Sequence, residues 1–382
     1  MDVVYLDNAA SAPLRPEALE AVSVHLKEHY ANPSSIHALG QAARKELERA
    51  RNAVASLIGA DASEIVFTSG ATEANNLAIR GVLMPLLDAG MKPHAVTTAL
   101  EHASVLKTLE SQVPRGLELT VVPPGPDGVV LAEDVLAAMR PETALISVIA
   151  VSNELGTRQP VEEIGRELDS RFRGNDRKPL FHVDAVQAVV STEIDFRTSR
   201  ADLFTVSAHK IGGPKGVGAL AVRKGLKLMP MLTGGGHEGG RRSGTENASG
   251  IAGFGAAADV LRSSRAAGID RYLKLRERLL SKLPAGAKPL VPADAHAAPH
   301  IVALECAGKE NDWVVLLMSR AGVMIAAGSA CKSGSREASE TVKALGLDDA
   351  RAKSVIRASF GPATEEKDVD AFVDALAQAL RR

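Results

Sequence analysis

The sequence contains few aromatic residues and few cysteines. Phenylalanine, tryptophan and tyrosine make up 3% of its 382 residues, with one tryptophan and three tyrosines. So few rings leave almost nothing from which to build the stacking platforms that bind single-stranded nucleic acids. Cysteine occurs twice, as Cys306 and Cys331. Two cysteines are too few for a disulfide framework in a chain of this length, which favours a reducing compartment.

The sequence also lacks an excess of charge of one sign and a long apolar run. Lysine and arginine total 45 and aspartate and glutamate total 46, so the formal net charge is −1. This balance is not typical of a nucleic-acid-binding protein, which carries a basic excess. No segment is long and apolar enough for a membrane span, and residues 1–7 do not resemble a signal peptide. We therefore expect a cytoplasmic protein that binds neither nucleic acid nor membrane.

Apolar residues, at 45%, and charged residues, at 24%, are present in ordinary globular proportions. Helix-like and strand-like segments alternate along most of the chain, which predicts an α/β fold with a mainly parallel sheet and helices on both faces. The expected helices cover residues 17–30, 40–57, 73–87, 160–168 and 251–283, where Gly268 could break the last one. The expected strands cover residues 64–68, 95–98, 117–122, 144–149, 180–184, 203–207 and 218–222, with two more at 301–304 and 354–359.

The pattern changes after about residue 250. An alanine-rich helical stretch is followed by a loop-like, proline-rich segment at 284–299 and then by the last two strands. We therefore expect a large domain at residues 12–260 and a smaller α/β domain built from residues 1–11 and 261–382. A polar stretch at residues 170–178 is expected to be a solvated surface turn.

In parallel sheets ligands bind at the carboxyl ends of the strands, so the residues that follow each strand are the functional candidates. The strand ending at Thr68 leads into a Ser-Gly-Ala-Thr turn at residues 69–72 and then a helix, an arrangement that suits phosphate but is also found in ordinary helix caps. Asp184 ends another strand. Lys210 follows a third strand and precedes a Gly/Pro turn, where desolvation would favour the neutral amine that forms Schiff bases; an ordinary surface lysine is the alternative.

Together these three features match the needs of pyridoxal phosphate: an anion cradle, a partner for the pyridinium nitrogen and a Schiff-base lysine. His102 could stack on the ring or transfer protons, although a single histidine is more often structural. Motifs for metal ions, such as Cys-x-x-Cys, and for nucleotides are not found. No resident metal is therefore expected.

Motifs spread over nearly the whole chain resemble those of the pyridoxal-phosphate-dependent cysteine desulfurases of the NifS/IscS type, in the class V aminotransferase group. The resemblance implies a fold-type I enzyme with a seven-stranded sheet in its large domain. The motifs are Tyr5-Leu6-Asp7-Asn8, Ala31-Asn32-Pro33-Ser34-Ser35-Ile36-His37, Phe67-Thr68-Ser69-Gly70-Ala71-Thr72-Glu73-Ala74-Asn75-Asn76, Glu101-His102, Asn153-Glu154-Leu155-Gly156, His182-Val183-Asp184-Ala185-Val186-Gln187, Ser207-Ala208-His209-Lys210, Gly234-Gly235-Gly236-His237-Glu238, Arg242-Ser243-Gly244-Thr245-Glu246-Asn247, Gly328-Ser329-Ala330-Cys331 and Arg357-Ala358-Ser359-Phe360-Gly361.

The resemblance assigns roles to the matching positions. Lys210 would carry the cofactor, His102 would stack on its ring and transfer protons, and Arg357 with Asn153 would bind the substrate carboxylate. Thr245 would reach the phosphate bound by a partner subunit, which implies a homodimer. The cofactor-binding residues implied are Ala71, Thr72, His102, Asn153, Asp184, Gln187, Ser207, Ala208, His209, Lys210 and Thr245.

Cys331 is the residue that separates a desulfurase from related enzymes. It lies in a run of small residues, so we expect a mobile loop that brings its thiolate to the substrate and carries sulfur away. The resemblance implies that L-cysteine becomes L-alanine while Cys331 gains a persulfide. The sulfur then passes to an acceptor such as an iron–sulfur scaffold protein, where Cys331 could contact the cluster transiently. Without the resemblance, the residues alone favour a small buried packing residue over a catalytic thiol, and that alternative suits Cys306 better.

Three departures from the family pattern stand out. Ala9-Ala10-Ser11 replaces a pair of threonines, and Ser152 stands where asparagine is common. The sequence ends at Arg382 without the tail that docks the scaffold in housekeeping bacterial members, so the acceptor stays open. The alternative enzymes are a selenocysteine lyase and a class V aminotransferase. The alternative without catalysis is a cofactor-binding regulator or a sulfur-carrier scaffold.

Overall fold

The structure, a computed structural model, describes residues 3–172, 178–292, 296–328 and 338–381. Its centre is a seven-stranded sheet in the order β2-β8-β7-β6-β5-β3-β4. β8 runs antiparallel to β7 and β2, and the other neighbouring strands are parallel. The seven strands lie where the sequence predicts them, which confirms the mainly parallel α/β sheet. They are β2 (Ile65–Thr68), β3 (His94–Thr98), β4 (Glu118–Val122), β5 (Thr143–Ile149), β6 (Leu180–Asp184), β7 (Leu203–Ser207) and β8 (Gly218–Val222).

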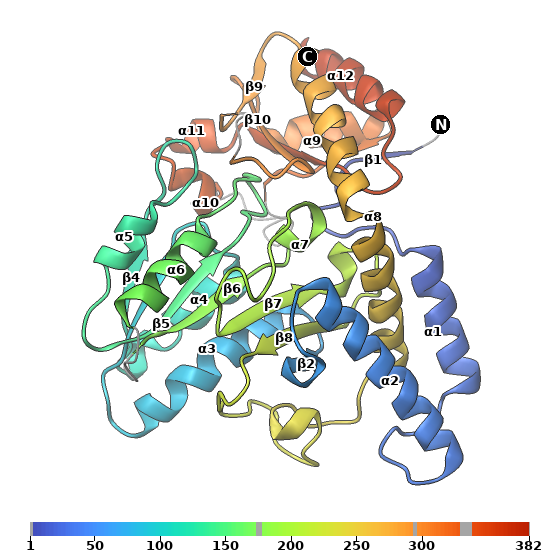
Figure 1. The fold of residues 1–382 in the computed structure, drawn as a ribbon. Coiled ribbons are helices and arrows are strands. Elements are labelled where there is room, and N and C mark those ends of the chain that lie inside the picture. Colours follow the sequence, from blue (N-terminus) through green and yellow to red (C-terminus); the bar gives the residue numbers. More distant parts are fainter. Residues whose placement is uncertain (1–2, 173–177, 293–295, 329–337, 382) are drawn as a thin grey trace.

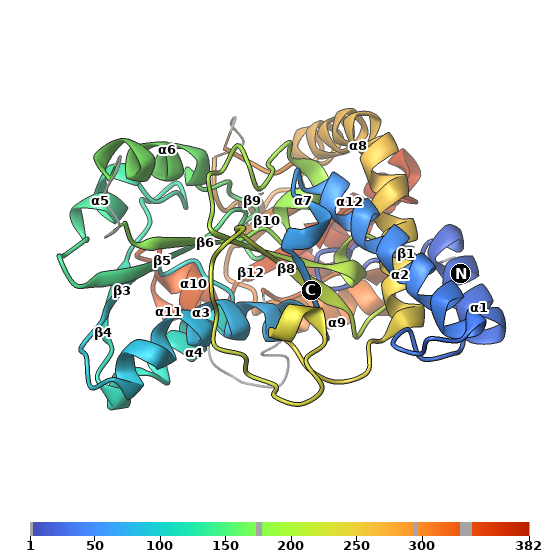
Figure 2. The ribbon, with the colours of Figure 1, turned by 60° about the horizontal axis from the view of Figure 1, so that its bottom comes forward.

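Helices cover both faces of this sheet. Figure 2 shows α3 and α4 on one face and α5 and α6 on the other. Strands that are covered on both faces consist of nearly continuous runs of apolar residues, so their positions can be predicted from the sequence. No helix in the described ranges is both long and apolar enough to cross a bilayer. The helices are α1 (Pro16–Glu28), α2 (Ala38–Leu57), α3 (Ala71–Asp88), α4 (Ala103–Glu110), α5 (Ala132–Ala137), α6 (Val161–Arg171) and α7 (Ala188–Ser191), with short 3-10 turns η1 (Ala62–Glu64), η2 (Val113–Arg115), η3 (Ala208–Lys210) and η4 (Glu238–Gly240).

One long helix, α8 (Ala248–Ser281), connects the sheet region to the rest of the chain (Figure 1). α1 and α2 pack along it. The helix continues through Gly268, so the break considered from the sequence does not occur. The domain boundary proposed at residues 260/261 therefore lies within a continuous helix.

The C-terminal part contains a three-stranded antiparallel sheet, β9 (Ala287–Pro289), β10 (Ile301–Cys306) and β12 (Val355–Ser359). β10 and β12 confirm the two strands predicted here. β9 corrects the expectation of a loop at 284–299: three residues including a proline carry no strand pattern. The N-terminal strand β1 (Val4–Tyr5) joins this part by pairing with β11 (Val323–Met324). The helices of this C-terminal part are α9 (Asn311–Arg320), α10 (Glu340–Lys343), α11 (Asp349–Ala352) and α12 (Glu366–Arg381).

A separate hydrophobic core lies in this part, and it includes Leu6, Cys306 and Phe372. Cys306 is fully buried, and burial raises the pKa of its thiol to about 12. This confirms Cys306 as an unreactive packing residue. The predicted turn at 170–178 is wrong at its start, because α6 continues to Arg171; residues 173–177 lie outside the described ranges.

Candidate active site

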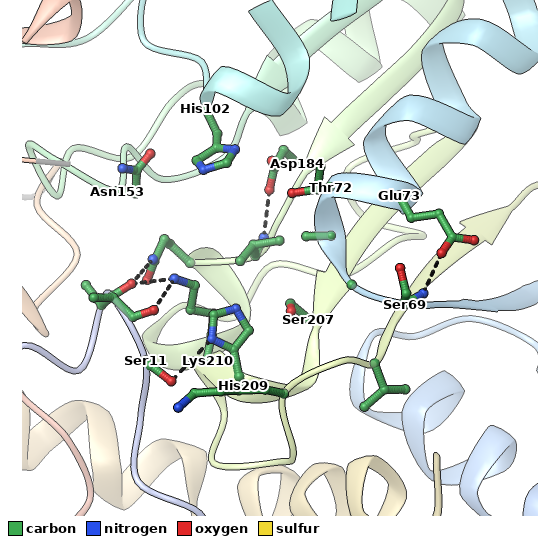
Figure 3. Close-up of a pocket in the computed structure, with 18 of the residues that line it drawn as sticks. Ser11, Ser69, Thr72, Glu73, His102, Asn153, Asp184, Ser207, His209 and Lys210 are labelled. Carbon is green, nitrogen blue, oxygen red and sulfur yellow. Dashed lines mark hydrogen bonds between the residues drawn. The ribbon is translucent and has the colours of Figure 1, made fainter. Parts of the chain in front are cut away.

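A cavity of about 450 Å³ lies where β2, β5, β6 and β7 end, at the carboxyl edge predicted from the sequence (Figure 3). Polar side chains reach it from several separate elements. The structure brings ten of the predicted site residues to this cavity: Ala71, Thr72, His102, Asn153, Asp184, Gln187, Ser207, His209, Lys210 and Arg357.

Three predicted residues are not among those lining the cavity. Ala208 is fully buried, and it is the first residue of the 3-10 turn η3 that follows β7. Thr245 is exposed and does not line the cavity of its own chain. Cys331 lies outside the described residues, so its role stays a prediction.

The anion cradle is built at the N-terminus of α3. Gly70 caps this helix without a side chain, so the first-turn N–H groups at Ala71 and Thr72 are not capped by one. β8 approaches closely: a Cβ added to Gly218 would lie 2.7 Å from the carbonyl carbon of Gly70. The Ser207 hydroxyl is buried and has no hydrogen-bond partner in the described part of the chain. An orphan hydroxyl beside free helix N–H groups is what a phosphate would satisfy.

Lys210 follows β7 at the end of η3, and its amine is held by the N-terminal segment. Nζ donates to the carbonyl oxygens of Ala9, at 2.6 Å, and Ala10, at 2.8 Å. In the sequence, Ala9 and Ala10 stand out only because they lack the hydroxyl groups of the usual threonines. Their carbonyl oxygens cannot be predicted as acceptors, because a backbone hydrogen bond does not depend on the type of side chain. Beside it, His209 has a pKa lowered to about 4, by burial first and by the Lys210 cation second.

Asp184 ends β6 and is 3% exposed. Its Oδ2 accepts from Asn75 Nδ2 at 2.8 Å, and its Oδ1 accepts from the backbone N–H of Val186 at 3.1 Å. It has no ion pair with any residue the structure describes. A buried carboxylate without a cation fits a protonated pyridine nitrogen. Sequence reasoning missed Asn75; the available signal was a polar residue on the apolar face of a helix.

His102 caps the N-terminus of α4, where its Nδ1 accepts from the backbone N–H of Ser104 at 3.1 Å. The preceding Glu101 is buried and accepts from Ile149 N–H and the Thr98 hydroxyl. Burial raises the pKa of Glu101 well above its usual value. In the view of Figure 3, His102 and Asp184 lie on one side of the pocket and Lys210 and His209 on the other.

Arg357, on β12, is 2% exposed. Its Nη2 donates to Asp7 Oδ1 and its Nη1 to the Asn153 carbonyl oxygen, each at 2.8 Å. Its Nε is buried and without a hydrogen-bond partner among the residues described. These contacts fix the guanidinium and leave donors for another anion at the cavity. Asp7 was missed as a site residue, although its motif was recognised.

These observations test whether pyridoxal phosphate fits the cavity. Among the described residues, a helix terminus without a side-chain cap and a hydroxyl without a partner suit the phosphate, and a buried carboxylate without an ion pair suits the ring nitrogen. A part-buried lysine suits the aldehyde. A fixed arginine remains for a substrate carboxylate. The residues present fit the group.

Comparisons with known proteins agree with the geometry. The family described as Aminotransferase class-V matches residues 4–372. A cysteine desulfurase from Trichormus azollae is 38% identical over 387 residues, a match that covers 100% of this chain and 94% of the relative. A solved structure of a NifS-like protein superimposes with a TM-score of 0.91 at 32% identity, covering 100% of both chains. A structure of SspA in complex with cysteine has a TM-score of 0.79 at 32% identity and covers 94% of this chain and 99% of that one.

Proposed function

Since the chain belongs to the class-V aminotransferase family, and within it to the pyridoxal-phosphate-dependent cysteine desulfurases of the NifS/IscS type with fold type I, we propose residue roles for that reaction here. Lys210 binds the cofactor covalently, and Asp184 pairs with the ring nitrogen. The observation that carries this proposal is the buried Asp184, which forms no ion pair with any described residue and lies at the same cavity as the Lys210 amine and the α3 terminus.

The remaining cofactor contacts follow from position around the cavity. The N–H groups of α3 and the hydroxyls of Thr72 and Ser207 hold the phosphate with His209. His102 and Asn153 face the ring region, and Gln187, whose amide donates to the Ala9 carbonyl at 2.9 Å, faces the ring hydroxyl. When bound, pyridoxal phosphate supplies the electron sink that the protein's own side chains lack.

The substrate is L-cysteine, whose carboxylate binds to Arg357. The guanidinium is already oriented by Asp7 and by the Asn153 carbonyl, so little ordering is needed on binding. The cysteine complex of the similar SspA supports this substrate. Lys210, which lies within hydrogen-bond reach of two carbonyl oxygens, is the candidate to move the substrate α-proton once it is released from the cofactor.

Cys331 receives the sulfur. Its thiolate attacks the substrate sulfur, the carbon–sulfur bond breaks, and L-alanine leaves after protonation, so one sulfur atom is transferred to the enzyme as a persulfide. The buried Cys306, with its raised pKa, does not compete for this role. The persulfide then passes to a sulfur acceptor, such as an iron–sulfur scaffold protein, with Cys331 in transient contact with the cluster.

Quaternary structure and location belong to the same proposal. The chain forms a homodimer in which the exposed Thr245 contacts the phosphate of the partner's site. Residues 1–11 and 261–382 form the smaller domain that bears Cys331, and the reaction takes place in the cytoplasm, where the free thiol of Cys306 stays reduced.

The visible absorption of bound pyridoxal phosphate tests the cofactor assignment. The purified wild-type protein should show a visible band that is lost in Lys210→Ala. Lys227→Ala, which removes an exposed lysine that does not line the cavity, is the matched control and should keep the band. A band that survives in Lys210→Ala would show that another residue carries the cofactor.

A further inference from the structure

Asn75 connects two parts of the site that the sequence keeps far apart. Its side chain is fully buried on α3. Its Nδ2 donates one hydrogen to Asp184 Oδ2 at 2.8 Å and the other to the Ser104 hydroxyl at 2.9 Å. The amide nitrogen faces Asp184, where it donates to a carboxylate oxygen, which is an acceptor.

The chain of hydrogen bonds continues to His102. The Ser104 hydroxyl accepts from Asn75, so its own hydrogen is available for His102 Nδ1, which lies 2.7 Å away. The backbone N–H of Ser104 also donates to the same nitrogen at 3.1 Å. Nδ1 therefore acts as an acceptor, and the proton of the neutral imidazole is on Nε2.

We propose that Asn75 is a positioning residue that orients both Asp184 and His102. One amide orients the carboxylate that pairs with the cofactor ring and orients the Ser104 hydroxyl, which together with the Ser104 backbone N–H holds His102 Nδ1 as an acceptor. This proposal rests on the proposed function for its catalytic meaning, but the hydrogen-bonded chain exists without the cofactor.

Two physical consequences follow. Loss of the Asn75 amide leaves Asp184 with the Val186 N–H as its remaining donor among the described residues, so the carboxylate can rotate and pair less well with the ring nitrogen. Loss of the Ser104 hydroxyl removes one donor to His102 but leaves Asp184 untouched. The two arms of the network are thus separable by substitution.

The first experiment measures the histidine tautomer in the protein without cofactor. Nitrogen-15 NMR of labelled histidine, assigned with His102→Gln, should show the wild-type His102 protonated on Nε2. Ser104→Ala removes the hydroxyl but keeps the backbone N–H that donates to Nδ1, so it should raise the fraction of the Nδ1-protonated tautomer only in part. Asn75→Ala, which frees the Ser104 hydroxyl to rotate, should raise that fraction less. Asn76→Ala is the matched control, because that neighbouring amide donates to the Thr72 carbonyl of its own helix.

The second experiment measures the dissociation constant of pyridoxal phosphate from its visible band. Asn75→Ala should weaken binding at least about tenfold, the loss expected for a hydrogen bond to a charged group. Ser104→Ala should weaken binding less, and Asn76→Ala should bind like the wild type. If Asn75→Ala does not fold, as judged by thermal unfolding, the similar-sized Asn75→Leu, which also lacks a donor, replaces it with the same expected direction.

The outcomes separate the two proposals. Wild-type tautomer and wild-type affinity in the Asn75 variants, or equal effects in Asn76→Ala, would overturn the positioning role. A wild-type protein that does not bind pyridoxal phosphate would overturn the proposed function, while the NMR result would still decide whether the network sets His102.

Discussion

At the scale of single residues, Arg357 shows how the fold prepares a polar group for a ligand. The guanidinium is nearly fully buried, and Asp7 offsets its charge across a 2.8 Å ion pair. A second carboxylate can bind the remaining donors only in the plane that these contacts fix. The proposed binding of a substrate carboxylate therefore depends on the planar fork of arginine, and not on its charge alone.

Arg357→Lys should weaken the binding of substrates that carry a carboxylate. Lysine keeps the charge but loses the fork, so KM for L-cysteine should rise about tenfold or more. The apparent affinity for cysteamine, which has no carboxylate, should stay near the wild-type value. The binding of L-cysteine and of cysteamine can each be followed through the visible band of the cofactor. Equal losses for the two compounds would point to a general collapse of the pocket.

The residue scale also shows what sequence reasoning can reach. Asp184 and Lys210 are predictable because Asp184 is the last residue of a parallel strand and Lys210 comes three residues after another. Asn75, Asp7 and the carbonyl of Ala9 are not, because their roles depend on contacts between segments more than 100 residues apart for Asn75 and more than 200 for Ala9. Only the folded chain defines such pairs.

At the scale of elements, a strand can be predicted from the sequence when both of its faces are buried. The seven central strands were found because helices cover both faces of the sheet, which makes each strand an apolar run. β1, β9 and β11 were not found, since two or three residues carry no periodic pattern. The sequence makes Gly268 a possible break in α8, but the helix is continuous from Ala248 to Ser281.

Two glycines of α8 should respond to alanine in opposite directions. A Cβ at Gly268 would meet no atom closer than 4.0 Å, so Gly268→Ala should stabilise the protein by roughly 0.5–1 kcal/mol through helix propensity. A Cβ at Gly255 would lie 2.6 Å from Ala50 Cα, so Gly255→Ala should lower the free energy of unfolding by pushing α2 from α8. Denaturant unfolding of both variants measures the signs; stabilisation at Gly255 would contradict the close packing of the two helices.

At the scale of the whole molecule, buried neutral histidines connect stability to pH. Burial lowers the pKa of His182 to about 4 and that of His300 to about 3. Both values are below that of the unfolded chain, near 6.5. The unfolded state therefore binds more protons than the folded state below about pH 6.5, and each histidine removes stability as the pH falls from there toward 4. Glu101, with its raised pKa, acts in the opposite sense.

His182→Gln isolates one of these contributions. In the sheet His182 lies between the hydroxyls of Ser147 and Thr205, which glutamine can still contact. The variant should lose stability on acidification less steeply than the wild type, by about 1.4 kcal/mol per pH unit between pH 6 and 4.5. Unfolding free energies of both proteins, measured across this range, give the two slopes. Equal slopes for the wild type and the variant would mean that His182 has the same pKa in the folded and unfolded states.

The central claim is that this chain transfers sulfur from L-cysteine to Cys331 with pyridoxal phosphate held on Lys210. Mass spectrometry of peptides after brief incubation with L-cysteine, without added reductant, measures it most directly. The account predicts one added sulfur atom on the Cys331 peptide, none on the Cys306 peptide, and none on either in Lys210→Ala. Release of alanine with an unmodified Cys331 peptide, or continued alanine release in Cys331→Ala, would contradict it.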